Sequence, residues 1–198
     1  MLPATIVSEI MYLFEAYGAE DYDGEPVSHT AHMVQCGMLA LHHSGDPELV
    51  IGAFLHDIGH LLKHTQATTT MGNFGVADHE GIGAGFLRQQ GFSDRVCAIV
   101  GGHVAAKRYL VATDDAYCKR LSPASLETLR WQGGPMQALE IDAFEKNPFF
   151  NDIIAVRHWD EAAKDTEAQL ALLHYFEQQM INHLTLQQHA AAHSTRSF

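Results

Sequence analysis

The sequence predicts an all-α protein that folds as a single helical bundle. Apolar residues recur at helical spacing over most of the 198 residues, and signals for helix starts and stops lie between these stretches. No segment alternates apolar and polar residues as a half-buried strand would. Because 46% of the residues are hydrophobic, we expect one domain with a substantial core over residues 1–185, followed by a flexible tail over 186–198.

The first part of the chain is expected to form three helices separated by short loops. Residues 5–17 place apolar side chains on one face, which is the pattern of an amphipathic helix, and the acidic segment 19–26 is expected to be a loop. A second helix is expected over 29–44. Asp46 and Pro47 then begin a third, because aspartate caps free backbone N–H groups and proline suits the first helical position.

Similar signals predict the helices of the second part. Residues 64–77 are polar and contain two glycines, so they are expected to form a loop. Further helices are expected from Asp78 to Gly91, from Ser93 to His103, from Ser122–Pro123, from Gly134–Pro135 and over about 164–184.

Charge and cysteine usage limit the classes of partner. The formal net charge of −12 disfavours nucleic acid or an anionic membrane, and no apolar run reaches the ~20 residues that cross a bilayer. The amino terminus lacks the basic region of a signal peptide. Cys36, Cys97 and Cys118 are spaced without pattern, which favours free thiols and a cytoplasmic location. We expect a small-molecule partner and a monomer or small homo-oligomer.

Histidine is the residue type that points to function, with fourteen copies in the chain. His56 and Asp57 are expected well inside an otherwise apolar helix, where burying an imidazole and a carboxylate is costly unless something binds them. Adjacent helical residues point about 100° apart, so both reach one metal cluster only at the helix edge. The pair alone is weak evidence of a site, because this dipeptide often arises by chance.

Four further residues complete a ligand set with this pair. His32 lies on the preceding expected helix, His79 opens a helix, His103 closes one, and Asp160 lies in a later segment. Four imidazoles and two carboxylates, one of them able to bridge, would hold two ions of the iron, manganese or zinc type and leave positions open for substrate or water. Each histidine taken singly is better explained by an ordinary core or surface role, but the set favours a metal centre.

The order of these six residues resembles that of the HD-domain superfamily. Within it, the chain is most similar to the mixed-valence di-iron oxygenases that cleave carbon–phosphorus bonds, and more distantly to myo-inositol oxygenase. The strings that carry the resemblance are DYDGE (21–25), HMVQC (32–36), LHDIGH (55–60), MGNFGV (71–76), GHVAAKRYL (102–110), QGGPM (132–136) and VRHWDE (156–161). The resemblance covers roughly residues 20–165 and implies an HD-domain helical bundle with a dinuclear metal site in its core.

The resemblance implies the metal, its ligands and the loop that faces it. The cofactors would be two iron ions, Fe(II) and Fe(III), with O2 as co-substrate. Asp57 would bridge the two ions, one of them held also by His32, His56 and Asp160 and the other by His79 and His103. At rest Tyr22 would occupy the open position of the second ion, and Glu25 would meet a cationic nitrogen of the substrate. Tyr22, Glu25 and His60 are the expected catalytic residues.

The resemblance also implies an organophosphonate substrate. The residues expected to bind it are Glu25, His60, Lys107, Ser125, Thr128, Gln132 and Arg157. The expected reaction is oxidative C–P cleavage of (1R)-1-hydroxy-2-(trimethylammonio)ethylphosphonate or 1-hydroxy-2-aminoethylphosphonate, which releases phosphate and glycine betaine or glycine. Tyr22, Phe74 or Tyr109 would offer an aromatic face to a quaternary ammonium, so the trimethylated substrate is slightly favoured.

Two other functions remain open from the sequence. Most HD proteins are metal-dependent phosphohydrolases that use metal-activated water, so hydrolysis of a phosphate ester is the alternative. The extra pair His79 and His103, together with the loop from Tyr22 to Glu25, favours the oxygenase. A non-catalytic module that only binds a ligand is disfavoured, because it would tolerate the loss of several ligands.

Overall fold

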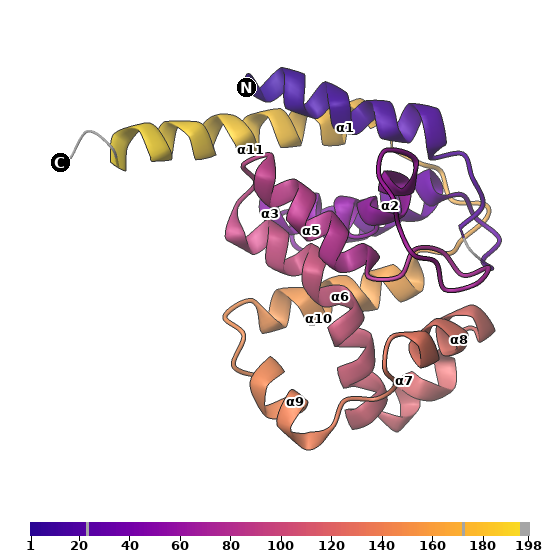
Figure 1. The fold of residues 1–198 in the computed structure, drawn as a ribbon. Coiled ribbons are helices and arrows are strands. Elements are labelled where there is room, and N and C mark those ends of the chain that lie inside the picture. The colour runs from indigo at the N-terminus through magenta and orange to yellow at the C-terminus, as the bar shows by residue number, and fades with distance from the viewer. Residues whose placement is uncertain (23, 172, 195–198) are drawn as a thin grey trace.

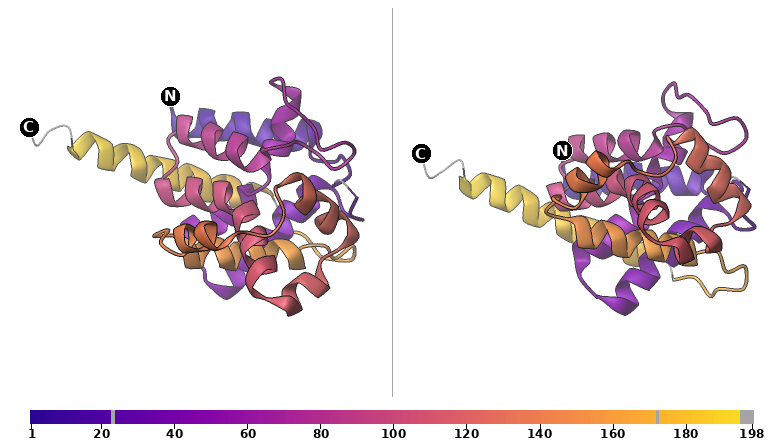
Figure 2. Two further views of the ribbon diagram at one scale, coloured as in Figure 1. Left: turned by 60° about the horizontal axis from the view of Figure 1, so that its bottom comes forward. Right: turned by 90° about the horizontal axis from the view of Figure 1, so that it is seen from below.

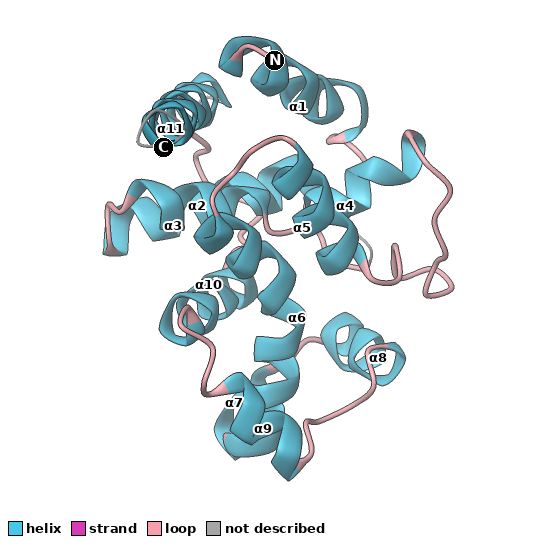
Figure 3. Cartoon of the chain, turned by 60° about the vertical axis from the view of Figure 1, so that its left-hand side comes forward, coloured by secondary structure: helices cyan, strands magenta, loops and turns pink. Residues whose placement is uncertain are grey.

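The chain folds as a bundle of helices, as the sequence predicts. The computed structural model describes residues 1–22, 24–171 and 173–194, and this part contains no strand, only two isolated bridges, Asp21–Ser28 and Thr70–Val76 (Figures 1 and 3). The helices are α1 (Pro3–Tyr17), α2 (His29–His43), α3 (Pro47–Leu55), α4 (Ile58–Leu61), α5 (His79–Gln89), α6 (Asp94–Thr113), α7 (Asp115–Arg120), α8 (Pro123–Trp131), α9 (Ala138–Phe144), α10 (Phe150–Ala162) and α11 (Leu173–Ser194), with a 3-10 turn at Leu62–His64.

The helices form three tiers when viewed from the side. Helices α1 and α11 pack together on one side, and α2, α3, α6 and α10 form the middle of the molecule (Figure 1). The small helices α7, α8 and α9 surround the far end of the long helix α6, as the two turned views also show (Figure 2). This arrangement gathers α2, the α3–α4 junction, α5, α6 and α10 around one central region.

Aromatic stacking joins the outer tier to the middle of the bundle. The rings of Phe14 and Phe54 stack with centroids 4.8 Å apart, and Phe54 stacks on Phe176 at 4.2 Å. Gly37 allows Phe176 to approach, because a Cβ at that glycine would lie 2.6 Å from the Phe176 ring. Helices α1, α2, α3 and α11 therefore share one close-packed apolar core.

Three of the expected helix starts, at Asp46, Ser93 and Ser122, are confirmed by their caps. The Asp46 carboxylate accepts hydrogen bonds from the backbone N–H groups of Glu48 and Leu49 at 3.0 and 3.2 Å. Ser93 and Ser122 cap α6 and α8 by accepting bonds from the third residue beyond each serine. These bonds satisfy donors that the first helical turn leaves free.

The last two expected helices have the wrong boundaries. The helix expected from Gly134–Pro135 begins later, at Ala138, where Gln137 and Glu140 form a capping box. The helix expected over 164–184 runs over Leu173–Ser194, after a connection that follows α10.

The tail expected from residue 186 is helical as far as Ser194. The earlier part of α11 packs against α1, whereas most side chains over 186–193 are exposed, and Gln188 Nε2 donates a hydrogen bond to the Met1 carbonyl at 2.9 Å. Residues 195–198 lie outside the described residues. Within the described part, no helix is both long and apolar enough to cross a membrane, and the three cysteines are free thiols.

Candidate metal centre

The His56–Asp57 pair lies at a break between two helices, not inside one as expected. Helix α3 ends at Leu55 and α4 begins at Ile58, and Asp57 has a non-helical ψ of 14°. In an unbroken helix the two side chains would diverge by about 100°. The break turns both toward the centre of the bundle, where both are buried.

Backbone carbonyls fix the orientation of four buried histidine rings. The Nδ1 atoms of His56, His79 and His103 lie 2.8, 3.1 and 2.8 Å from the carbonyl oxygen three residues earlier, and His32 Nδ1 lies 2.9 Å from the Ala163 carbonyl. A carbonyl oxygen only accepts, so each Nδ1 carries the proton. In the neutral rings every Nε2 therefore presents a lone pair.

These lone pairs point at one another in two couples. His32 Nε2 lies 3.1 Å from His56 Nε2, and His79 Nε2 lies 3.0 Å from His103 Nε2. Two lone pairs at this distance repel unless a proton or a cation lies between them. Neutral imidazole nitrogens held by a second hydrogen bond are the usual ligands of transition metals. The donor set therefore fits metal ions.

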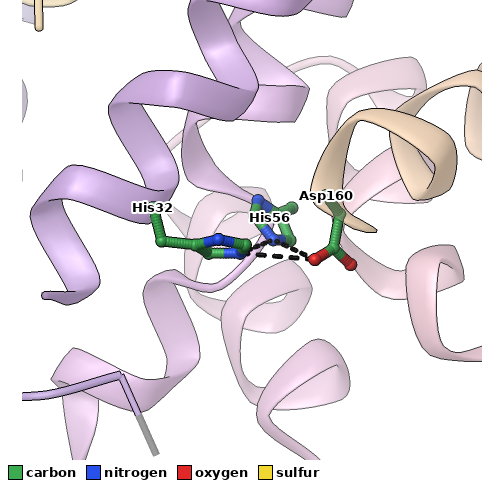
Figure 4. A group of neighbouring side chains, drawn as sticks. All are labelled: His32, His56 and Asp160. Atoms are coloured by element: carbon green, nitrogen blue, oxygen red, sulfur yellow. Dashed lines mark hydrogen bonds and ion pairs between the residues drawn. The ribbon is translucent and has the colours of Figure 1, made fainter. Parts of the chain in front are cut away.

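The first half of the centre contains His32, His56 and Asp160. Figure 4 shows these side chains pointing toward one another from α2, the α3–α4 junction and α10. Asp160 Oδ1 lies 3.3 Å from His32 Nε2 and 3.7 Å from His56 Nε2. One ligand atom from each of the three lies within 4.8 Å of the others, close enough to share one ion.

The second half lies on the other side of Asp57. His79 Nε2 and His103 Nε2 lie 3.3 and 3.2 Å from Asp57 Oδ1. A tight group of potential ligands here contains Asp57, His60 and His79, so His60 is also near enough to take part. His103 lies in the middle of α6, whereas the sequence placed it at the end of a helix.

Asp57 faces both halves of the centre. Its Oδ1 points to His79 and His103, and its Oδ2 lies 3.3 and 3.5 Å from the Nε2 atoms of His56 and His32. Oδ2 is buried and accepts no hydrogen bond from the described residues. Burial alone would raise the pKa of this carboxyl, but the neighbouring imidazoles, His56 foremost, hold it well below its ordinary value. Asp57 is therefore placed to bridge two cations.

A cavity opens beside this centre, and every residue expected to bind substrate lines it. Its walls are Tyr22, Glu25, Asp57, His60, Met71, Phe74, His79, His103, Val104, Lys107, Ala124, Ser125, Thr128, Gln132, Arg157 and Asp160. Tyr109 is absent from this lining: its ring packs against Phe144 and Phe150, and its hydroxyl donates to Glu145. Of the three aromatic side chains expected as alternatives for the ammonium group, Tyr22 and Phe74 line the cavity and Tyr109 does not.

One wall of the cavity suits an anion. Lys107 Nζ donates to Thr128 Oγ1 at 2.9 Å, and burial, followed by repulsion from Arg157, lowers the pKa of Lys107 to about 7. A buried lysine that lacks a carboxylate partner gains from a negatively charged ligand. The Gln132 Oε1 atom is buried and accepts no hydrogen bond from the described residues, so this amide oxygen is available to a hydroxyl of a ligand rather than to its anionic group.

Arg157 holds the metal centre in place as well as lining the cavity. Its Nε donates to the Tyr117 hydroxyl at 2.6 Å, its Nη1 donates to Asp160 Oδ2, and its Nη2 donates to Glu161. Three of the five N–H donors of the guanidinium are thus engaged within the protein. The bond to Oδ2 leaves Asp160 Oδ1 turned toward His32 and the first half of the centre.

Two of the three expected catalytic residues, Tyr22 and His60, border the centre. The Tyr22 ring stacks on His32 with centroids 4.0 Å apart, and burial, then the charge of Asp57, raises the pKa of Tyr22 well above its ordinary value. His60 Nδ1 accepts a hydrogen bond from the Val76 N–H at 3.2 Å, so the neutral ring carries its proton on Nε2. Burial lowers the pKa of His60 well below its ordinary value, which keeps the ring neutral.

Sequence reasoning missed several polar residues around the site. Tyr117 orients Arg157, Glu161 and Lys164 form ion pairs beside it, and His29 is fully buried with its ring 5.4 Å from that of His60. The spacing of Arg157 and Glu161, at i and i+4, was the available signal for an ion pair on one helix face, whereas Lys164 lies beyond the end of α10.

Comparison with known proteins agrees with this geometry. A model of the HD domain family matches residues 30–171. The chain is 44% identical over 169 residues to a [1-hydroxy-2-(trimethylamino)ethyl]phosphonate dioxygenase (glycine-betaine-forming) of Leisingera caerulea, covering 83% of each chain. It is 36% identical to a hydroxymethylphosphonate dioxygenase of Gimesia maris, covering 82% of this chain and 80% of the relative.

A third relative, an uncharacterized protein of Acanthamoeba polyphaga mimivirus, is 37% identical and covers 90% of this chain and 82% of its own length. The family match spans the segment from α2 to the connection after α10, which supplies all six expected metal ligands. The chain therefore belongs to the HD domain family, and within that family it is similar to proteins named as phosphonate dioxygenases.

Proposed function

We propose that this protein is an iron-dependent oxygenase that cleaves the C–P bond of a 1-hydroxyphosphonate with O2. The observation that carries the proposal is the pair of facing imidazole couples on either side of Asp57, beside a cavity with a buried lysine. The names of two relatives, both phosphonate dioxygenases, support the same chemistry.

The six residues predicted as ligands would hold two ions. His32, His56 and Asp160 would bind the first, His79 and His103 the second, and Asp57 would bridge them. When bound, two iron ions would supply the activation of O2 and the one-electron oxidation of the substrate carbon. The absence of thiolates and the mixture of imidazole and carboxylate ligands fit iron better than a structural zinc.

The anion-binding wall of the cavity would receive the phosphonate. Lys107 would donate a charge-assisted hydrogen bond, and the Gln132 amide N–H would add a neutral donor. The hydroxyls of Ser125 and Thr128, which donate to Glu161 and to the Ser125 carbonyl in the free protein, would turn to the phosphonate. His60 would donate from Nε2, and Arg157 has N–H donors beyond the three that it uses within the protein. These contacts would orient C1 and its hydroxyl toward the second half of the centre.

Another part of the cavity lining would receive the rest of the substrate. Glu25 lines the cavity together with the rings of Tyr22 and Phe74, and a carboxylate beside aromatic faces suits an alkylammonium group. We therefore favour 1-hydroxy-2-(trimethylammonio)ethylphosphonate as the substrate, with the 2-amino compound as the other candidate. The products would be phosphate with glycine betaine or glycine.

The overall reaction balances with one O2 for each substrate. The carboxylic acid gains one oxygen atom at C1, the phosphate gains the other at phosphorus, and the C–P bond breaks. Tyr22 stacks over His32 at the border of the cavity, so substrate entry would require this ring to shift. A protonated Tyr22 is the form that burial favours in the metal-free protein.

The test is metal analysis joined to a phosphate-release assay. Purified protein supplied with iron should hold about two irons per chain, give a mixed-valence EPR signal that the trimethylammonio substrate perturbs, and release phosphate only with O2. The alternative within the HD family is a phosphohydrolase that uses metal-activated water. Phosphate release from a phosphate ester without O2, and none from the phosphonate, would establish that alternative.

A further inference from the structure

A row of alternating charges links the metal centre to the loop that carries Glu25. Arg157 pairs with Asp160 and with Glu161, and Lys164 Nζ lies 2.9 Å from Glu161 Oε1 and 2.9 Å from Glu25 Oε1. The side chains of Glu25, Glu161 and Lys164 are only 10%, 17% and 16% exposed. Solvent therefore screens these ion pairs less than it would on an open surface.

The local structure explains how Lys164 reaches Glu25. Arg157 and Glu161 lie one turn apart on α10, which ends at Ala162, so Lys164 follows the helix end and can extend toward residues 20–28. Ser122, the cap of α8, donates to the same Glu25 oxygen at 2.5 Å. Three distant segments thus converge on one carboxylate.

Glu25 keeps one oxygen for a ligand. The bonds from Lys164 and Ser122 both go to Oε1, and no described residue donates to Oε2. Glu25 lines the substrate cavity, whereas Lys164 does not. A cationic group in the cavity would therefore approach Glu25 from the side opposite to Lys164 and would share its charge.

We propose that Lys164 is a built-in counter-ion of Glu25 that sets how strongly the site prefers cationic substrates. With no substrate bound, Lys164 neutralises the Glu25 carboxylate. A substrate with an ammonium group must share that carboxylate with Lys164, so its binding is weaker than an unpaired Glu25 would give. A substrate without a cationic group does not compete with Lys164 for the Glu25 carboxylate, so Lys164 should not affect its binding. The inference rests on the proposed function, because it assigns the cationic end of the substrate to Glu25.

The test compares Lys164→Met with wild type on three compounds: the trimethylammonio substrate, its 2-amino analogue and hydroxymethylphosphonate, which lacks a cation. Binding is measured by calorimetry on iron-loaded protein without O2, and phosphate release is measured separately. Lys164→Met should bind the two cationic compounds about tenfold more tightly, because it removes a competing positive charge from a poorly solvated carboxylate. Binding of hydroxymethylphosphonate should stay within about twofold of wild type, since no cation meets Glu25.

Three further variants serve as controls. Lys164→Arg keeps the charge and should keep the wild-type preference. Lys146→Met removes a lysine that is exposed and outside the cavity, and it should leave all three affinities unchanged. In a Glu25→Gln background the Lys164→Met change should no longer alter the preference, because the shared carboxylate is gone.

Equal changes for all three compounds, or weaker binding of the cationic ones by Lys164→Met, would overturn the role of Lys164. Failure of the proposed function has a different signature, namely no phosphate from any compound with wild-type protein and O2. The binding ratios are obtained without turnover, so they decide the Lys164 inference by themselves.

Discussion

Lys107 is a residue whose charge is costly in the free protein and useful in the complex. It is 4% exposed, its one hydrogen bond within the described part of the chain goes to the neutral Thr128, and Arg157 is the main repelling charge near it. A buried cation without a carboxylate partner lowers stability, and a dianionic phosphonate would restore the balance. The stability of the free protein and the affinity for substrate should therefore move in opposite directions when this residue is changed.

The first prediction follows from this opposition between the stability of the free protein and its affinity for the phosphonate. The pKa of Lys107 is about 7 in the folded protein and 10.5 for the free side chain. Between these two pH values the unfolded chain therefore binds more protons than the folded protein. The free energy of unfolding of wild type should therefore increase with pH across this window. Metal-free Lys107→Met should be more stable than wild type by about 3 kcal/mol at pH 7, with the difference shrinking toward pH 10.

Urea unfolding of the metal-free proteins at pH 7, 8 and 9 measures the stability difference. Phosphonate affinity of the iron-loaded variant should fall about 100-fold, because a charged partner is lost from a buried site. Lys146→Met, at an exposed position, should show neither effect. A Lys107→Met protein that is less stable than wild type at every pH would contradict the argument.

The site residues that the sequence predicted are recognisable from their local neighbourhood, whereas those that it missed depend on contacts with distant residues. His56 and Asp57 are conspicuous because their type conflicts with an apolar neighbourhood, and His79 because it opens a helix after a loop. Glu161 and Lys164 look like an ordinary solvated helix end. Their role depends on the position of Glu25, which is 139 residues before Lys164, and no local pattern reports that contact.

At the scale of the elements, the junction of α3 and α4 determines the geometry of the centre. The sequence favoured one continuous apolar helix here, because nothing in the composition marks the break at His56 and Asp57. Gly59 explains why α4 can come so near to α5. A Cβ at this position would lie 2.0 Å from the His79 carbonyl oxygen and 2.7 Å from its carbonyl carbon.

The second prediction concerns this close approach. Gly59→Ala should push the start of α5 away from Asp57, lower the stability by about 2 kcal/mol, and reduce the iron content, with His79 the ligand most displaced. The matched control is Gly85→Ala on α5, where a Cβ meets no atom within 4 Å. That change should retain full iron content and raise stability by up to about 1 kcal/mol, since alanine favours a helix over glycine.

Iron per chain and thermal unfolding of the two variants are the measurements. If Gly59→Ala held as much iron as Gly85→Ala, then the close packing of α4 on α5 would not matter for the centre.

At the scale of the whole molecule, the helices that pack together are far apart in sequence. Helical periodicity predicts that the chain is all-α, and caps predict several starts, but neither signal reports that α11 packs on α1. The sequence also placed the end of ordered structure near residue 185, whereas α11 continues to Ser194. Most side chains of this continuation are exposed, and the leucine, glutamine and alanine residues of 186–192 favour a helix by themselves, so the missed signal was local.

The third prediction separates the two parts of α11. Removing residues 186–198 should leave phosphate release within about twofold and cost about 1 kcal/mol, because Leu186 is exposed and the deletion removes the hydrogen bond from Gln188 to Met1. Removing residues 173–198 should prevent folding, because Phe176, Met180 and Leu184 belong to the core. Circular dichroism melting and phosphate release check both. Full stability of the longer deletion would contradict the assignment of α11 to the core.

The carbonyl partners of the four imidazole rings also bear on how such a centre evolves. His56, His79 and His103 are each oriented by the main chain three residues earlier, and His32 by the main chain at Ala163. Every residue type supplies a carbonyl, so these positions can vary without disturbing the rings. Selection can then alter the side chains of the cavity while the metal chemistry is inherited intact. Two of the relatives are named for different phosphonates, which agrees with cavity side chains that vary while the imidazole rings keep their orientation.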